Sequence, residues 1–186
     1  MKEYNEKKFN IPDLKGISRK NIEEHLKLYS GYVKNTNLIL QKIEEFGQHR
    51  FSFEWNGMRN HEYYFHSLEN GHKELSENSE LKKEIAKEFG GFDDWLTRFK
   101  SVALTRGVGW AMLYYDSQEK KLLNVWVDEQ HLGHLNSCHY IVGIDMWEHA
   151  YVYDYPTSEK KKYVEAFFEN LNWEVIEKNF RGAIKQ

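Results

Sequence analysis

Apolar residues in the first half of the chain recur at the three- to four-residue spacing of helices that bury one face. Ser18 is a suitable N-cap because its hydroxyl can accept an otherwise unpaired backbone N–H. Leu26, Tyr29 and Val33 then recur at helical intervals, and the pattern predicts a helix as far as about Phe46. Further helices are predicted over residues 56–67, 81–89 and 92–102, with a short turn over 73–78 and an extended arm over 1–16.

Beyond residue 109 the pattern changes to short aromatic and β-branched runs separated by polar turns, which is typical of strands. Strands are predicted over residues 110–115, 122–127 and 140–145, and helices over 158–171 and 175–180. Segregated helices and strands of this kind indicate an α+β fold. We expect an N-terminal α-hairpin domain over 1–89, then a C-terminal domain over 90–186 with a small three-stranded antiparallel sheet and helices. The boundary is placed at Gly90-Gly91, a typical helix end.

Composition narrows the function classes. The formal net charge is -3 and no long basic run is present, so nucleic acid is not expected as a partner. No stretch approaches the roughly 20 apolar residues of a membrane span, and no membrane association is expected. Residues 1–8 are polar and lack the apolar core of a secretory signal. The single cysteine, Cys138, suits a reducing compartment, so a cytoplasmic location is predicted.

The strongest chemical signal is an aspartate and a histidine four residues apart, Asp145 and His149. Residues 141–144 are apolar, so Asp145 should emerge from a buried strand and need a partner for its charge. A carboxylate with imidazoles suits a first-row metal ion such as iron, manganese or zinc. On spacing alone, a salt-bridged surface turn remains the alternative.

Two further histidines give weaker signals. His61 opens an aromatic helical stripe, and by itself it is more simply interpreted as a core histidine. His25 lies seven residues before Tyr32, so the two share a helix face. By itself, His25 is more simply interpreted as a histidine at the rim of an amphipathic helix. Spacing does not show whether these side chains meet.

Four segments resemble the iron/manganese superoxide dismutase family, in the family's order, over about residues 11–180. Residues 145–151, Asp-Met-Trp-Glu-His-Ala-Tyr, are similar to the family signature D-x-W-E-H-A-Y. The other three segments resemble the family's N-H, G-S-G-W and N-W-E motifs and lie at residues 60–61, 107–110 and 172–174.

This resemblance implies an enzyme that converts superoxide to dioxygen and hydrogen peroxide at one manganese or iron ion per subunit. The implied metal ligands are His25, His61, Asp145 and His149. Tyr32 corresponds to the family's gateway tyrosine, Trp110 and Trp147 to rings that wall the metal pocket, and Glu148 and Tyr151 to a dimer interface. A homodimer is therefore expected, with a tetramer as the other possibility. The alternative is a metal-free structural or interaction protein on the same fold, and a metal hydrolase or dioxygenase fits less well because of the third histidine.

The chain departs from the family pattern near the gateway tyrosine. The family usually has eight positions between the first ligand and that tyrosine, which fits a π-bulge, whereas this chain has seven. We expect an uninterrupted helix that keeps His25 and Tyr32 on one face. The family also has a pair of histidines shortly before the gateway tyrosine. This chain has Leu28, Tyr29 and Ser30 in that stretch, and Tyr29 is a candidate substitute for the missing pair. Met112 replaces a tryptophan, as expected of altered core packing.

The choice of metal depends on which residue contacts the metal-bound solvent. Iron types in the family supply a side chain from four residues before the second ligand, where this chain has Gly57. Manganese types supply it from the sheet, where Gln130 is the match and His131 the alternative if the loop is offset. The resemblance therefore favours manganese. Lys27, Lys34 and Arg59 are candidates for attracting an anion, although each is more simply interpreted as an ordinary surface cation.

Overall fold

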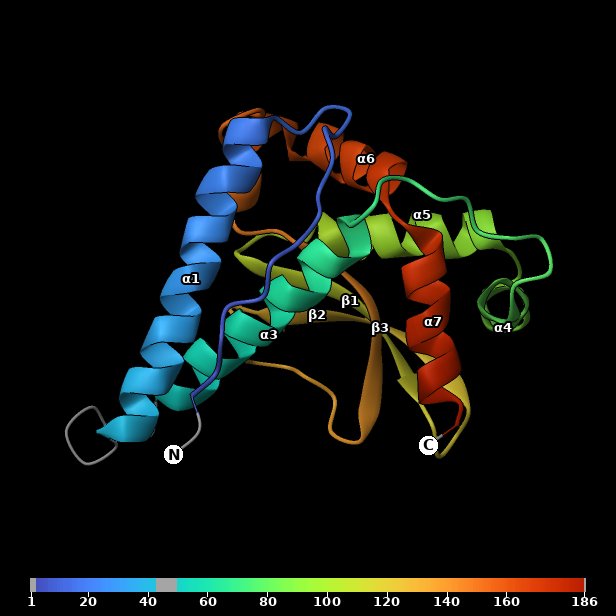
Figure 1. Ribbon diagram of the computed structural model, residues 1–186. Helices are drawn as coiled ribbons and strands as arrows, with labels where there is room; N and C mark the ends of the chain where they lie inside the picture. The colour runs from blue at the N-terminus through green and yellow to red at the C-terminus, as the bar shows by residue number, and fades with distance from the viewer. Residues whose placement is uncertain (1–2, 43–49, 186) are drawn as a thin grey trace.

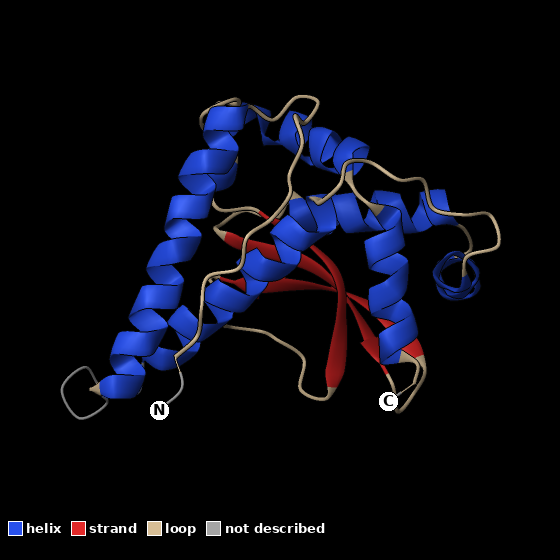
Figure 2. Cartoon of the chain, in the orientation of Figure 1, coloured by secondary structure: helices blue, strands red, loops and turns tan. Residues whose placement is uncertain are grey.

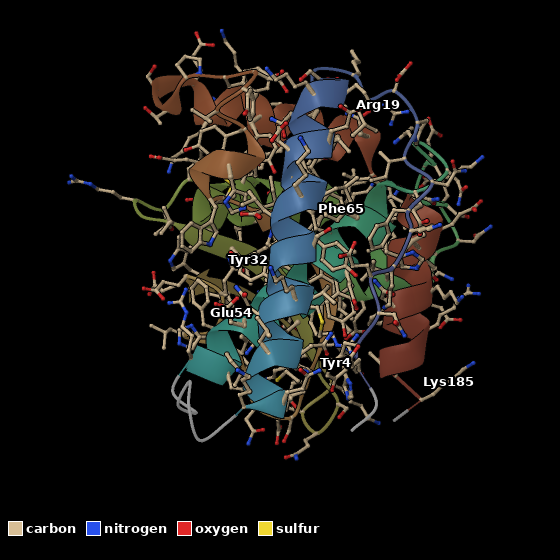
Figure 3. The ribbon with its side chains drawn as sticks, turned by 60° about the vertical axis from the view of Figure 1, so that its left-hand side comes forward. Tyr4, Arg19, Tyr32, Glu54, Phe65 and Lys185 are labelled. Atoms are coloured by element: carbon tan, nitrogen blue, oxygen red, sulfur yellow. The ribbon has the colours of Figure 1, made fainter. Side chains whose placement is uncertain are left out.

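A computed structural model describes residues 3–42 and 50–185 of the chain. Two long helices come first, α1 (Arg19–Gln41) and α3 (Phe51–Leu68), and they pack against each other (Figure 1). The extended arm before them is pinned by hydrogen bonds from Tyr4 N–H to the Asn37 side chain and from Lys7 N–H to the Tyr29 hydroxyl. Figure 3 shows Arg19 and Tyr4 near opposite ends of α1.

The start of α1 is the predicted one. The Ser18 hydroxyl accepts the backbone N–H of Asn21 at 3.1 Å, and α1 continues as an α-helix to Gln41. The predicted end near Phe46 lies outside the described residues. The second helix begins at Phe51 instead of Asn56, so the pattern missed its first turn.

Two shorter helices follow, α4 (Glu80–Phe89) and α5 (Phe92–Ala103). Gly90 separates them with a φ of +91°, a left-handed conformation that favours glycine. Trp95 and Phe99 are fully buried on the inner face of α5. Within the predicted short turn over 73–78, residues 77–78 form a turn and Lys73 pairs with Asn172 in an isolated parallel bridge.

The sheet has the antiparallel order β2-β1-β3, from β1 (Gly109–Asp116), β2 (Lys121–Asp128) and β3 (Cys138–Asp145). β1 is central and its residues 109–115 are all buried, which explains its continuous apolar run. The register places Trp110 opposite Asp145 on β3 and opposite Val127 on β2. Two residues that the sequence singled out thus lie side by side.

Helices α6 (Lys160–Asn170) and α7 (Trp173–Ala183) complete the chain, after the short 3-10 helices η2 (Glu148–Ala150) and η3 (Thr157–Glu159). Both α3 and α7 pack on β3, while α5 packs on β1 and β2, so helices lie against all three strands (Figure 2). The α+β class and the three-stranded antiparallel sheet are confirmed. No helix within the described residues is long and apolar enough to cross a membrane.

One hydrophobic core includes side chains from both sides of Gly90-Gly91. Tyr64 of α3 stacks on Phe167 of α6, with ring centroids 5.3 Å apart, and both rings are fully buried. The two halves therefore share apolar packing. The division into domains 1–89 and 90–186 stays a prediction.

Candidate metal centre

Four side chains from four elements meet in the interior: His25 from α1, His61 from α3, Asp145 from the end of β3 and His149 from η2. Each offers one ligand atom, and these atoms all lie within 4.8 Å of one another. The first three side chains are fully buried, and that of His149 is 20% exposed. The fold thus brings together all four residues that the family resemblance marked.

Asp145 is the centre of this group. Its Oδ2 lies 3.1 Å from Nε2 of both His25 and His149, and 3.5 Å from Nε2 of His61. Its Oδ1 accepts the backbone N–H of Trp147 at 2.8 Å. One oxygen therefore faces the imidazoles while the other is held by the backbone, which fixes the orientation of the carboxylate.

The tautomer of His61 follows from its hydrogen bond. Nδ1 donates to the backbone carbonyl of Gly57 at 2.6 Å, so the proton is on Nδ1 and the lone pair is on Nε2. That Nε2 atom is buried and has no hydrogen-bond partner among the described residues. A buried acceptor without a partner is costly, and a cation at this point would satisfy it.

Burial sets the charge state of the group. Desolvation lowers the pKa of His61 to about 3 and also lowers the pKa of His25. Burial opposes ionisation of Asp145, but the imidazoles of His149 and His25 outweigh it and hold the pKa of this carboxyl well below its usual range. Neutral imidazoles beside an ionised carboxylate are the protonation states that metal binding requires. This donor set fits iron or manganese.

The seven-residue spacing in α1 is accommodated without a π-bulge. All described residues from Arg19 to Gln41 are α-helical, and both His25 and Tyr32 face the centre. The ring of His25 lies 4.9 Å from that of His61, and the ring of Tyr32 lies 5.0 Å from the same imidazole. The expectation of an uninterrupted helix is met.

A second layer of polar contacts includes Gln130, which is fully buried in the loop after β2. Its Oε1 accepts the indole N–H of Trp110 at 2.9 Å, and its Nε2 donates to the Tyr32 hydroxyl at 3.0 Å. His131 instead packs edge-on against Phe53, with ring centroids 5.6 Å apart. Gln130 is thus the residue whose side chain joins the network around Tyr32.

Two indole rings lie against the histidines. Trp110 meets His61 edge-on at a centroid distance of 5.3 Å, and Trp147 stacks on His149 at 5.8 Å. The Trp147 indole donates to the backbone carbonyl of Glu129 at 3.1 Å, which fixes the plane of its ring. Both rings thus lie against candidate ligands, and Trp147 also lines the cavity described next.

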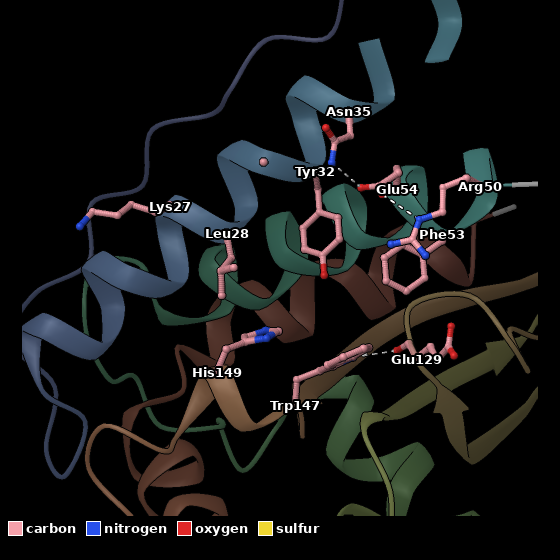
Figure 4. A pocket seen from close by; sticks show the side chains of 11 residues that line it. Lys27, Leu28, Tyr32, Asn35, Arg50, Phe53, Glu54, Glu129, Trp147 and His149 are labelled. Carbon is pink, nitrogen blue, oxygen red and sulfur yellow. Dashed lines mark hydrogen bonds and ion pairs between the residues drawn. The ribbon is translucent and has the colours of Figure 1, made fainter. Parts of the chain in front are cut away.

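A cavity of about 570 Å³ leads to the group, and Tyr32, Trp147 and His149 line it (Figure 4). Sequence reasoning missed Arg50, which also lines the cavity, with its guanidinium 3.9 Å above the ring of Phe53. No motif surrounds Arg50, so the sequence held no signal for it. Lys27 lines the cavity too.

The two other candidate cations, Arg59 and Lys34, lie outside the cavity. Arg59 is paired with Glu62 at 2.7 Å and does not line the cavity, and neither does Lys34.

Tyr29 is buried, accepts the backbone N–H of Lys7 and donates to Glu62 at 3.3 Å. The Tyr29 hydroxyl is thus bound to the arm and to α3, and its substitution for the missing histidine pair stays a prediction.

The two residues expected at a dimer interface differ in exposure. Glu148 is exposed in η2, beside the metal-ligand candidate His149. Tyr151 is only 4% exposed, because its ring stacks on Tyr163 within the same chain. Most of the Tyr151 surface is thus already covered by its own chain.

The fold and the site define an α+β protein with a buried three-histidine, one-aspartate centre of the kind that holds a redox-active metal ion. Residues 77–179 match the family model described as iron/manganese superoxide dismutases, C-terminal domain. The chain belongs to the iron/manganese superoxide dismutase family.

Individual relatives include both metal types. The chain is 33% identical to "Superoxide dismutase [Fe]" of Aquifex aeolicus, over 93% of this chain and 88% of that protein. It is 31% identical to "Superoxide dismutase [Fe]" of Cupriavidus metallidurans, over 92% of each chain. It is 39% identical to "Superoxide dismutase [Mn] 2" of Halobacterium salinarum, over 56% of this chain and 51% of that protein.

Proposed function

We propose that this protein is a superoxide dismutase that holds one manganese or iron ion per subunit. The observation that carries the proposal is the convergence of His25, His61, Asp145 and His149, with the lone pair of His61 Nε2 buried and unmatched among the described residues. A bound ion would supply one-electron chemistry between its +3 and +2 states, so that one superoxide is oxidised to dioxygen and a second, with two protons from solvent, is reduced to hydrogen peroxide. The metal-free alternative is not favoured, because all four ligand positions are filled.

The side chains around the four candidate ligands keep a hydroxyl protonated, fix the amide of Gln130 and cover the histidine rings. Burial raises the pKa of Tyr32 far above its ordinary value, so its hydroxyl stays protonated at neutral pH and can donate a hydrogen bond at the floor of the cavity. Gln130 is fixed between Tyr32 and Trp110 and cannot turn without losing one of these bonds. The indole rings of Trp110 and Trp147 limit water access to the histidines.

Manganese is the favoured ion. At Gly57 there is no side chain, and the ring of Tyr32 fills the space that one would need. The amide next to the centre comes instead from Gln130 on the sheet side, as the family's manganese types have it. The relatives carry both metals, so the preference is a proposal about this chain's own residues.

A homodimer is proposed as the assembly, with a tetramer as the larger possibility, and the cytoplasm as the location. Glu148 and Tyr151 are the candidate interface residues. Leu28, Val152 and Tyr153 are large apolar side chains 41%, 48% and 51% exposed, which supports a surface that a partner covers, and Leu28 also lines the cavity. The free thiol of Cys138 suits a reducing compartment.

The experiment is reconstitution of the metal-free protein separately with iron and with manganese, followed by measurement of bound metal and of superoxide consumption. We expect activity in at least one form, higher with manganese. His61→Gln should abolish tight metal binding, while His66→Gln, on the exposed face of the same helix, should leave it unchanged. A protein that binds neither ion would support the structural alternative, and one that binds metal without consuming superoxide would overturn the proposed activity.

A further inference from the structure

The backbone carbonyl of Gln130 is held from outside the metal centre. It accepts two hydrogen bonds, from the side-chain amide of Asn60 at 2.9 Å and from Nε2 of His134 at 3.0 Å. The first donor comes from α3. The second comes from the same loop, four residues later, and belongs to a histidine that the metal centre does not use.

The tautomer of His134 is determined by these contacts. Because Nε2 donates to the Gln130 carbonyl, Nδ1 carries the lone pair and accepts from the Tyr114 hydroxyl, 2.5 Å away. Burial lowers the pKa of His134, which keeps the ring neutral and this arrangement intact at physiological pH. A chain of hydrogen bonds therefore runs from Tyr114 on the central strand through His134 to Gln130.

The loop is built so that His134 can turn back on Gln130. Backbone bonds between Asp128 and Leu132 in both directions close the loop, at 2.8 and 3.1 Å. Gly133 then has a φ of +103°, which reverses the chain direction just before His134. A Cβ atom at Gly133 would lie 3.2 Å from the carbonyl oxygen of Trp126, so the turn favours glycine for space as well.

We propose that His134 is a positioning residue for Gln130: its imidazole, held by Tyr114, fixes the Gln130 peptide so that the side-chain amide meets Trp110 and Tyr32. His134 lines a cleft of about 310 Å³ that is separate from the cavity leading to the metal centre, and it acts only through Gln130. The link to catalysis rests on the proposed function, whereas the positioning of Gln130 does not.

The test measures the bond that His134 should protect. In the full-length metal-free protein, NMR would follow hydrogen exchange of the Trp110 indole N–H, which donates to Gln130 Oε1. The Trp95 indole N–H, which donates to Asn124 at 3.0 Å, reports global opening in the same spectra. His134→Leu should speed exchange at Trp110 by about tenfold, as for loss of one net hydrogen bond, and leave Trp95 unchanged.

Two further variants make the test specific. His134→Gln keeps an N–H donor and should restore most of the protection at Trp110. His139→Leu makes the same kind of change in the same cleft, at a residue with no hydrogen bond to Gln130 among the described residues, and should change neither signal. If His134→Leu does not fold, Tyr114→Phe removes only the hydroxyl that holds Nδ1 and should give a smaller increase at Trp110 alone.

Equal acceleration at Trp110 and Trp95 would mean that His134 acts on overall stability, and no change at either would mean that Asn60 holds the loop alone. Both results overturn the proposal. In the manganese-loaded protein, we also expect His134→Leu to shift the midpoint potential, with His134→Gln close to the original protein. If His134→Leu speeds exchange at Trp110 but not at Trp95, and the original metal-loaded protein consumes no superoxide, the proposed function is refuted while the positioning role of His134 is retained.

Discussion

The ring of Tyr32 lies directly against Gly57. A Cβ atom on Gly57 would be 2.5 Å from Cδ1 and 2.6 Å from Cε1 of that ring, closer than non-bonded atoms approach. Gly57 also offers the carbonyl that holds Nδ1 of His61. One helical glycine therefore accommodates the ring of Tyr32 and fixes the tautomer of a ligand candidate.

Replacing Gly57 by alanine should therefore destabilise the protein, although alanine ordinarily favours a helix by about 1 kcal/mol over glycine. Overpacking against Tyr32 should cost roughly 1–3 kcal/mol, and the displaced hydroxyl should reduce kcat/KM roughly tenfold to a hundredfold. Urea unfolding and superoxide consumption are the measurements. Gly182→Ala is the control, since no atom elsewhere in the described chain lies within 4 Å of its added Cβ. A stabilised, fully active Gly57→Ala protein would contradict the packing described above.

Acid should destabilise the metal-free protein through the buried imidazoles. The pKa of His61 is lowered to about 3 in the folded state, against an ordinary value of 6.5, so the unfolded chain binds more protons between these values. Stability must then rise with pH across this range. Lowering the pH from 7.5 to 5.5 should reduce the free energy of unfolding by roughly 1 kcal/mol from His61 alone. The pKa of Asp145 is also lowered, so its contribution to the free energy of unfolding is lost only below the ordinary value of 3.8.

Denaturant titrations of metal-stripped protein at the two pH values measure this effect. His61→Gln should show a pH dependence smaller by the same roughly 1 kcal/mol, because it removes the titrating ring. His66→Gln should retain the original dependence, since that ring is exposed. Identical pH dependence in all three proteins would show that His61 is not held neutral in the fold.

The N-terminus of α4 is capped from α7 by Glu177. Its carboxylate accepts the Ser79 hydroxyl at 2.6 Å and the backbone N–H groups of Glu80 and Leu81 at 3.0 and 3.2 Å, and Arg181 donates to it at 2.9 Å. Burial opposes ionisation, but these donors outweigh it and lower the pKa of Glu177. The cap therefore stabilises the fold at neutral pH and is lost as the pH falls below the ordinary value of 4.5.

Glu177→Gln should reduce the free energy of unfolding by roughly 1–2 kcal/mol at pH 7. The difference from the original protein should shrink as the pH falls below 4.5, because the unfolded carboxylate takes up a proton there before the folded one does. Glu88→Gln, an exposed change near the other end of α4, should stay within about 0.5 kcal/mol. A pH-independent difference would mean that the charge of Glu177 is not what holds the cap.

The proposed homodimer should depend on Glu148. A lysine at this position reverses the charge at the candidate interface, and a buried charge without its partner typically costs about 3–5 kcal/mol. Light scattering during size-exclusion chromatography should show Glu148→Lys as a monomer at concentrations where the original protein is a dimer. Glu119→Lys, in the exposed turn between β1 and β2, should remain dimeric. A dimer that persists in Glu148→Lys would place the interface elsewhere.

The sequence determined the elements and part of the site. Helices and strands were predictable because burial of one face imposes a period on apolar residues, as in α1 with Tyr29 and Val33. Strand β1 was readable because its whole run is apolar. Asp145 and His149 stood out because they lie four residues apart, after a buried strand.

Only the tertiary structure decided which distant side chains meet. Nothing within α1 or α3 alone requires His25 and His61 to lie 4.9 Å apart, since that distance depends on how the two helices pack against the sheet. Loop geometry decides that the Gln130 amide bonds the Tyr32 hydroxyl, and the extended arm decides that the Tyr29 hydroxyl bonds Lys7. Local periodicity sets the face on which a residue lies, but a site made of four elements is fixed by long-range packing, which no local pattern encodes.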